Sequence, residues 1–252
     1  MTARTVVAIA SLSVALPLAG CASFYEIPVE TPIQAKINVG AFQRVLVAGF
    51  LSGGSQSIDA NAETARLLRS QLRNRQDLRV IDSDALSLVE EMDRRLGLKP
   101  ETRNADDPRF ADAKALEAHA AIFNDAEYWK KLGEEYQQPL IVTGTVVFTE
   151  VTRSGVVSRP QSVVNSQGLE EYRTVREYSD LRGYALTPNF VFIDGRTGAQ
   201  LYTEAYHEEA LYPTSQNTPA LSSYFELMDK VLPSFLNTLS TQRIRGSRVL
   251  LK

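Results

Sequence analysis

Cysteine, histidine and tryptophan are scarce in this chain: its 252 residues include one cysteine, two histidines and one tryptophan. A single cysteine excludes an intramolecular disulfide. Neither His119 nor His207 stands in the His-Glu-x-x-His spacing of a zinc site. The chain also lacks a P-loop, a Gly-x-Gly-x-x-Gly motif and a Gly-x-Ser-x-Gly motif. The sequence therefore predicts no catalytic residue, no metal site and no cofactor.

The chain has no excess of basic residues: it contains 27 lysines and arginines and 30 acidic residues, so its formal net charge is -3. Affinity for nucleic acid comes mainly from basic side chains on phosphates, so no nucleic-acid partner is expected. Hydrophobic residues make up 44% of the chain and charged residues 23%, as in ordinary globular proteins. The length allows one or two domains with a sizeable core.

The longest apolar run near the start covers residues 5–18 and follows the positively charged Arg4. It is too short for a typical transmembrane helix, which needs about 20 apolar residues. A short apolar core behind a positive charge and before small residues is typical of a signal peptide. Residues 1–20 are therefore predicted to be a signal peptide that is removed on export.

The segment ends in Leu18-Ala19-Gly20-Cys21, and Cys21 is the sole cysteine. This ending resembles the lipobox of bacterial lipoproteins. The resemblance implies that the signal peptidase recognises Leu18, Ala19 and Gly20, and that Cys21 carries the lipid that anchors the protein. No aspartate follows the cysteine directly, which by the same resemblance favours the outer membrane over the inner one. The alternative is an ordinary secretory signal with a chance cysteine.

The exported part divides into a tether and a folded body. Residues 21–41 contain Pro28 and Pro32, show no clear periodicity, and are expected to link the lipid to the body. Residues 42–252 are expected to form one periplasmic α/β domain. Within it, residues 152–184 are predicted to be a long, mobile β excursion.

Apolar patterning predicts the element order β-α-β-α-α-β-β-β-α, which indicates a mixed β-sheet flanked by helices. The expected strands cover residues 44–50, 78–81, 140–151, 184–194 and 199–209. The expected helices cover residues 60–74, 83–97, 111–136 and 219–239. Asp59 is the predicted N-cap of the first helix, and the third is expected to break near Asn124. One face of the last helix is expected to carry Leu221, Phe225, Met228, Leu232 and Leu236.

Three segments carry a resemblance to a known family: residues 79–82 (Arg-Val-Ile-Asp), 141–146 (Ile-Val-Thr-Gly-Thr-Val) and 192–198 (Phe-Ile-Asp-Gly-Arg-Thr-Gly). Their order resembles the periplasmic domain shared by the curli-secretion channel CsgG, the penicillin-binding-protein activator LpoB and the TolB N-terminal domain. The resemblance covers roughly residues 42–240. It implies a non-catalytic envelope lipoprotein that either forms pores or binds partner proteins.

The pore-forming members insert two β-hairpins per subunit into a membrane, and this sequence departs from that pattern. Residues 171–178 present charged side chains on both strand faces, whereas a lipid-facing strand needs one apolar face. The connection 210–220 is too short for a second spanning hairpin, because each strand needs about 9–11 residues. Self-assembly into an export component is therefore the alternative function, and hydrolysis of an envelope polymer is a third.

The late strands are rich in tyrosine, a residue favoured at protein interfaces. Side-chain packing with the hydroxyl at the rim of the core is the other interpretation of these residues. The leading hypothesis is a non-enzymatic outer-membrane lipoprotein that binds another envelope protein, as an accessory to secretion or cell-wall assembly. The oligomeric state and the identity of the partner stay open. The candidate docking residues are Tyr172, Tyr178, Tyr202 and Tyr206.

Overall fold

The computed structural model describes residues 24–75, 78–97, 110, 112, 114–165 and 167–251. The predicted signal peptide and Cys21 lie outside these residues. The described chain divides into two compact units. The large unit covers residues 34–242, and the small unit combines residues 24–33 with residues 243–251.

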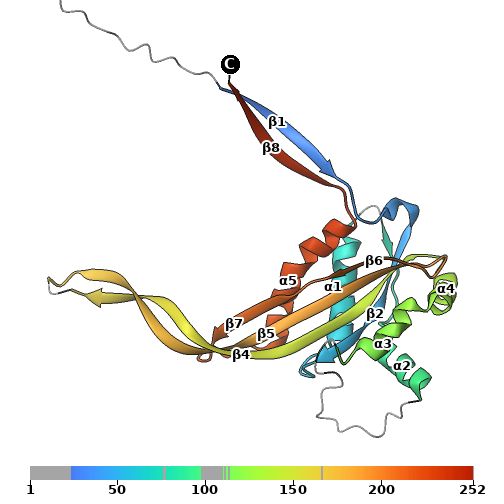
Figure 1. The fold of residues 1–252 in the computed structure, drawn as a ribbon, viewed down its shortest axis with the longest axis horizontal. Coiled ribbons are helices and arrows are strands. Elements are labelled where there is room, and N and C mark those ends of the chain that lie inside the picture. The colour runs from blue at the N-terminus through green and yellow to red at the C-terminus, as the bar shows by residue number, and fades with distance from the viewer. Residues whose placement is uncertain are drawn as a thin grey trace, which may run out of the picture. The chain divides into compact units, whose positions relative to one another are not determined.

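The large unit is a mixed α/β structure with the predicted order of elements (Figure 1). Its helices are α1 (Ala60–Arg73), α2 (Leu88–Leu96), α3 (Glu117–Ala120), α4 (Ala126–Glu135) and α5 (Ala220–Thr238). Its strands are β2 (Arg44–Gly54), β3 (Arg79–Val80), β4 (Leu140–Val164), β5 (Glu170–Asp194), β6 (Gln200–Ala205) and β7 (Glu208–Pro213). No helix in the described residues combines the length and the hydropathy needed to cross a bilayer.

The six strands form one sheet in the order β3-β2-β4-β5-β6, and β7 also pairs with β5. β2 runs parallel to β3 and β4, whereas β5 runs antiparallel to β4, β6 and β7. The predicted strand 199–209 is divided at residues 206 and 207, because its two halves pair with different parts of β5. β5 therefore pairs with three strands of the sheet: β4 along its whole length, β6 near its end and β7 near its middle.

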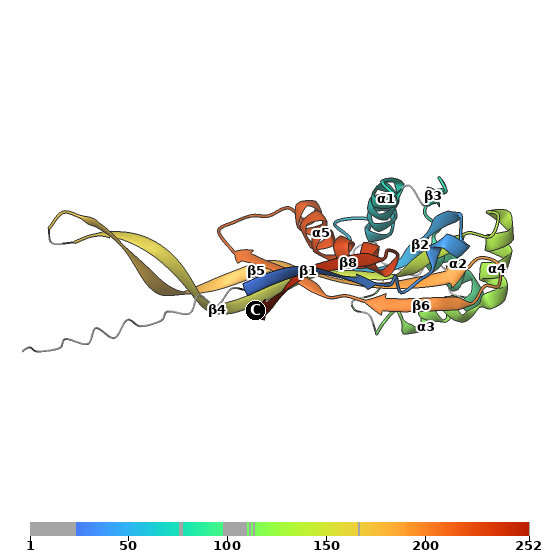
Figure 2. The ribbon, with the colours of Figure 1, turned by 90° about the horizontal axis from the view of Figure 1, so that it is seen from above.

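Helices cover both faces of the sheet, as Figure 2 shows. On one face α1 and α5 pack over inward residues of β2, β4 and β5, including Val45, Val142 and Phe190. On the other face α2, α3 and α4 pack over Leu46, Ile141 and related residues. Because both faces are covered, β2 is apolar at nearly every position, as the sequence pattern predicted.

Local signals explain where the helices begin. The Asp59 side chain accepts a hydrogen bond from the Ala62 amide at 3.0 Å, which confirms the predicted N-cap of α1. Asp125 does the same for α4 and separates it from α3, where the break was expected. The second helix begins at Leu88, five residues later than predicted, and ends at Gly97 with a left-handed backbone (φ 68°).

Glycines let α4 approach the turn that follows β5. A Cβ atom at Gly133 of α4 would lie 1.9 Å from the carbonyl oxygen of Gly195, and one at Gly198 would lie 1.8 Å from that of Ala126. Atoms that close cannot coexist, so the helix and turn require bare backbone at these positions. The segment 192–198 therefore has a definite packing role.

The small unit is a two-stranded ribbon of β1 (Phe24–Ile33) and β8 (Gln242–Leu251). This differs from the expectation of a tether without regular structure over residues 21–41. The large unit likewise begins at Gln34 and not at residue 42, and it ends at Gln242. The pairing joins residues more than 200 positions apart in sequence, and no local pattern in residues 24–33 reveals it.

Candidate docking site on the hairpin arm

β4 and β5 extend far beyond the other strands of the sheet (Figure 1). The last pairing of β7 with β5 is at Leu181, and β2 stops pairing with β4 at Phe148. Within the described residues, positions 154–164 and 170–180 thus pair only with each other. We call these residues the arm. Eleven residues of antiparallel strand span about 37 Å.

The tip of the arm is closed by a local turn. The Asn165 side chain accepts hydrogen bonds from the amides of Gln167 and Leu169, both at 3.0 Å. The Asn165 amide donates to the Leu169 carbonyl at 2.9 Å, and Gly168 has a left-handed backbone with φ 78°. Asparagine and glycine favour such turns. The expected excursion 152–184 is therefore a regular hairpin in the structure.

The two faces of the arm differ in chemistry. Residues paired directly across an antiparallel ladder project to the same side. One side, here called the tyrosine face, places Tyr178 opposite Val156 and Tyr172 opposite Ser162, with Arg176 between the two tyrosines. Tyr172 and Tyr178 are 74% and 69% exposed, and Val156 is 67% exposed. The other side, the charged face, carries Arg159, Glu171, Arg173 and Glu177, with two smaller exposed valines, Val163 and Val175.

The arm has features of an interaction element. A two-stranded hairpin is marginally stable in water on its own. Its outer edges offer unpaired backbone groups that can bind another strand. At the base of the arm the Thr214 amide donates to the Asp180 carbonyl at 3.0 Å; from there to the tip, no other strand of the described residues pairs with either edge of the arm. An exposed surface that combines tyrosines, a valine and an arginine has the composition that is favoured at protein interfaces.

The other two candidate tyrosines lie elsewhere. Tyr202 is on β6 opposite Phe192, which is 14 residues from Tyr178 along β5. At strand spacing this separation is about 46 Å. Tyr206 follows β6 and packs against Phe190, and burial raises the pKa of its hydroxyl to about 12. The structure thus groups Tyr172 with Tyr178 on the arm and places Tyr202 and Tyr206 against the body.

Tyr202 contributes to a contact that fastens the start of the large unit. The Lys36 ammonium forms an ion pair with Glu204 and lies 5.3 Å from the centre of the Tyr202 ring. Thr238 donates a hydrogen bond to the other Glu204 oxygen at 2.6 Å. Burial raises the pKa of Glu204, but the hydrogen bonds from Lys36 and Thr238 outweigh it and leave the pKa lowered. Residues from Lys36 onward therefore belong to the folded body.

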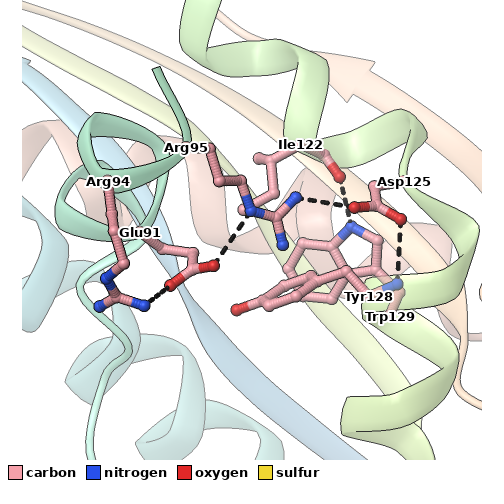
Figure 3. A network of polar contacts seen from close by, with 7 residues as sticks. All are labelled: Glu91, Arg94, Arg95, Ile122, Asp125, Tyr128 and Trp129. Carbon is pink, nitrogen blue, oxygen red and sulfur yellow. Dashed lines mark hydrogen bonds and ion pairs between the residues drawn. The ribbon is translucent and has the colours of Figure 1, made fainter. Parts of the chain in front are cut away.

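A second polar network joins α2 to α4 (Figure 3). The Arg95 guanidinium donates to Glu91 at 3.0 Å and to Asp125 at 2.7 Å. Its central carbon lies 4.7 Å from the centre of the Tyr128 ring. The sequence could have revealed part of this network, because Glu91 and Arg95 are four residues apart on a helix.

Beside this network lies an open groove of about 700 Å³. Its walls carry charges of both signs, and most of them come from α4. The Arg95 and Asp125 side chains already bond to each other, so they offer little to a ligand. We therefore interpret this network as a structural link between α2 and α4, here called the strap. The groove is lined by Glu91, Arg95, Asp125, Glu127, Tyr128, Lys130, Lys131, Leu132, Glu134 and Glu135.

Asp125 makes this strap sensitive to acid. The Tyr128 amide donates to its carboxylate at 3.0 Å and lowers its pKa; burial opposes this, and Arg95 lowers the pKa further. A lowered pKa stabilises the fold above the ordinary value of about 3.9 and stops doing so as the pH falls through the folded-state value.

Replacing Asp125 with asparagine should therefore cost about 0.5–1 kcal/mol at pH 6, and the difference should shrink as the pH falls below about 4. Asparagine is also a good N-cap, so this variant isolates the charge. Asp125→Ala removes the cap as well and should cost about 1 kcal/mol more. Urea unfolding across this pH range measures both. A difference between wild type and Asp125→Asn that does not change with pH would contradict the assignment.

The histidines do not form a catalytic set in the described residues. His119 lies on α3, and its Nε2 is 3.0 Å from the buried carboxylate of Asp93 on α2. His207 is exposed and bonds to Thr187 at 2.9 Å. No group of three or more metal-binding side chains occurs in the part of the chain that is described. Trp129, on the inner side of α4, is fully buried in the core.

Comparison with known proteins adds distant structural likenesses only. No protein-family model matches the chain, and no curated protein sequence matches it. The LpoB C-terminal domain from Salmonella enterica is 11% identical with a TM-score of 0.28, and the match covers 68% of this chain and 84% of that one.

Two further solved structures are similarly distant. Lipoprotein GNA1162 from Neisseria meningitidis is 13% identical with a TM-score of 0.31, over 77% of this chain and 98% of that one. A neuraminyllactose-binding hemagglutinin homolog from Helicobacter pylori is 9% identical with a TM-score of 0.34, over 82% and 88%. At these identities and TM-scores the likenesses assign no function to this chain.

Proposed function

We propose that this chain is a non-enzymatic outer-membrane lipoprotein that binds another envelope protein through the tyrosine face of its arm. The observation that carries the proposal is the arm itself. It presents two tyrosines that are about 70% exposed, beside an exposed valine, on a hairpin whose edges pair with no other strand of the described chain beyond Asp180. Its position on a rigid, helix-covered sheet holds this surface away from the body of the large unit.

The anchor is the second part of the proposal. The lipobox-like ending before Cys21 supports attachment of acyl chains to the sole cysteine. Several acyl chains hold a protein far more firmly than one, because each buried CH2 contributes about 0.8 kcal/mol. A body confined to a membrane surface meets envelope proteins at high local concentration. Confinement at the membrane therefore favours binding to an envelope protein over catalysis on a freely diffusing substrate.

The test of this function has two stages in cells that produce the full chain. Incorporation of a labelled fatty acid should occur in the wild type and be lost in Cys21→Ser. Crosslinking followed by affinity purification should then recover an envelope protein in wild-type cells, in a complex that involves the arm. Recovery of copies of this chain alone would favour self-assembly into an export component. Turnover of peptidoglycan by the purified protein would contradict the non-enzymatic part.

A further inference from the structure

The ribbon of β1 and β8 has two chemically distinct faces. The Glu30 carboxylate lies 2.9 Å from Arg245 and 3.7 Å from Arg243, so these three side chains share one face. Side chains alternate along a strand, so Glu26 joins this charged face and the odd-numbered residues of β1 lie opposite. The opposite face carries Tyr25, Ile27, Val29 and Ile33 from β1 and Ile244 from β8.

This apolar face is open within the small unit. Tyr25 is 67% exposed, Ile27 39% and Ile244 53%. A two-stranded ribbon has no second layer against which it can bury an apolar side. Five apolar residues aligned on one face of so short a ribbon therefore call for an occupant from outside the unit.

The position of the ribbon in the chain points to that occupant. β1 begins at Phe24, and only two residues separate it from Cys21. Three residue steps span at most about 10 Å of extended chain, so lipids on Cys21 would place the start of β1 at the bilayer surface. A second copy or a soluble partner has no comparable reason to meet this face.

The charges of the ribbon fit the same occupant. β8 contributes Arg243, Arg245 and Arg248, whereas β1 contributes only Glu26 and Glu30. A net positive charge is attracted to anionic headgroups. Arg248 has the parity of Ile244 and lies at the apolar face, where a long side chain can reach the headgroups while its stem lies among apolar groups.

We propose that the β1/β8 ribbon lies in the membrane interface with its apolar face toward the acyl chains. This inference rests on the proposed lipid anchor at Cys21. The ribbon then attaches the protein to the bilayer in addition to the acyl chains on Cys21. Two membrane-binding elements in one protein commonly act together to anchor it stably. It also brings the C-terminal strand to the same surface as the N-terminus.

The test uses the full chain, purified with its lipids and reconstituted into vesicles of phosphatidylethanolamine and phosphatidylglycerol. Ile27→Cys introduces one free thiol, because the Cys21 sulfur carries lipid, and this thiol is labelled with the environment-sensitive dye NBD. Glu26→Cys is the matched control, one residue away on the charged face. Ile33→Cys repeats the measurement at the other end of the ribbon. Doxyl-labelled lipids then quench any dye that enters the acyl region.

Lipid-borne quenching at positions 27 and 33 should be at least threefold stronger than at position 26. Equal quenching at the three positions would overturn the proposal. A dye at position 27 that is shielded from water but not quenched would also overturn it, since a protein surface would then cover the face. Mass measurement of the same samples separates the two claims. Acyl mass on Cys21 without face-specific quenching contradicts the ribbon alone, and absence of acyl mass contradicts both.

Discussion

Replacing Tyr172 and Tyr178 together with serine should lower the recovery of crosslinked partner about tenfold or more, with no change in the thermal stability of the protein. Both side chains are highly exposed, so their removal costs the free protein almost no packing. At an interface, buried tyrosines are among the residues whose truncation costs more than about 1 kcal/mol each. Two such losses exceed the 1.4 kcal/mol that corresponds to a tenfold change in affinity.

The charged face of the arm offers a matched control. Val163 and Val175 are 38% and 39% exposed and lie on the opposite side of the same hairpin. The double variant Val163→Ser and Val175→Ser removes apolar surface from the arm without touching the tyrosine face, and it should retain partner recovery. Equal losses in both double variants would mean that the arm matters only through its folding, and would contradict a face-specific interface.

A Gly133→Ala substitution should destabilise the protein by about 2 kcal/mol or more, although the same change in an open helix stabilises it by up to about 1 kcal/mol. The sign is reversed because the new methyl group would lie 1.9 Å from the backbone oxygen of Gly195. The atoms nearest to this methyl group all belong to the backbone of Gly195, so no flexible side chain could move aside to make room. Either α4 or the turn at residues 194–198 must shift, and the core beneath Trp129 must shift with it.

Urea unfolding of the mature chain measures this effect, with Cys21→Ser as the common background. Gly155→Ala serves as the control, because a Cβ at this position of the arm meets nothing within 4 Å. Its effect should stay within about 0.5 kcal/mol, as for most surface substitutions. A stabilising Gly133→Ala variant would show that the helix does not approach the turn as closely as described.

The parts of the fold that could be predicted from sequence are those with local causes. The apolar run of β2 reflects burial on both faces, and the caps at Asp59 and Asp125 are short-range hydrogen bonds. The strand at residues 44–50, the Asp59 cap and the helix break near Asn124 followed from residue type and spacing alone. The mixed sheet with flanking helices, which depends on the order of such elements, was confirmed as well.

The face of α5 shows where local pattern fails. Two apolar stripes run along this helix, and the one that includes Leu221 and Phe225 was predicted to be buried. The structure buries Met228 and Leu232 of the predicted face, but it also buries Tyr224, Val231 and Phe235. Leu221 is left 44% exposed. The Tyr224 hydroxyl bonds to Thr64 of α1, so a contact across 160 positions selects the stripe. The spacing of apolar residues within α5 alone cannot indicate that Tyr224 contacts Thr64 of α1.

The arm was hard to predict for a different reason. Alternating hydrophobicity marks a strand only when one of its faces is buried. Between Leu181 and the tip of the arm, both faces of the hairpin are exposed. Charged and β-forming residues therefore occur there without a clear alternation of polar and apolar side chains. The sequence suggested Tyr172 and Tyr178 as docking residues through their residue type. It could not show that Tyr202 and Tyr206 lie against the body, because that separation depends on the pairing of β5 with β6.

Photo-crosslinking from single positions on the arm tests directly whether the tyrosine face binds another protein. A crosslinkable phenylalanine analogue at position 178 replaces an exposed tyrosine on the tyrosine face, and the same analogue at position 177 points from the charged face. In living cells we expect one discrete adduct with another envelope protein from position 178 and little or none from position 177. Adducts of equal yield from both positions, or adducts only between copies of this chain, would contradict this expectation.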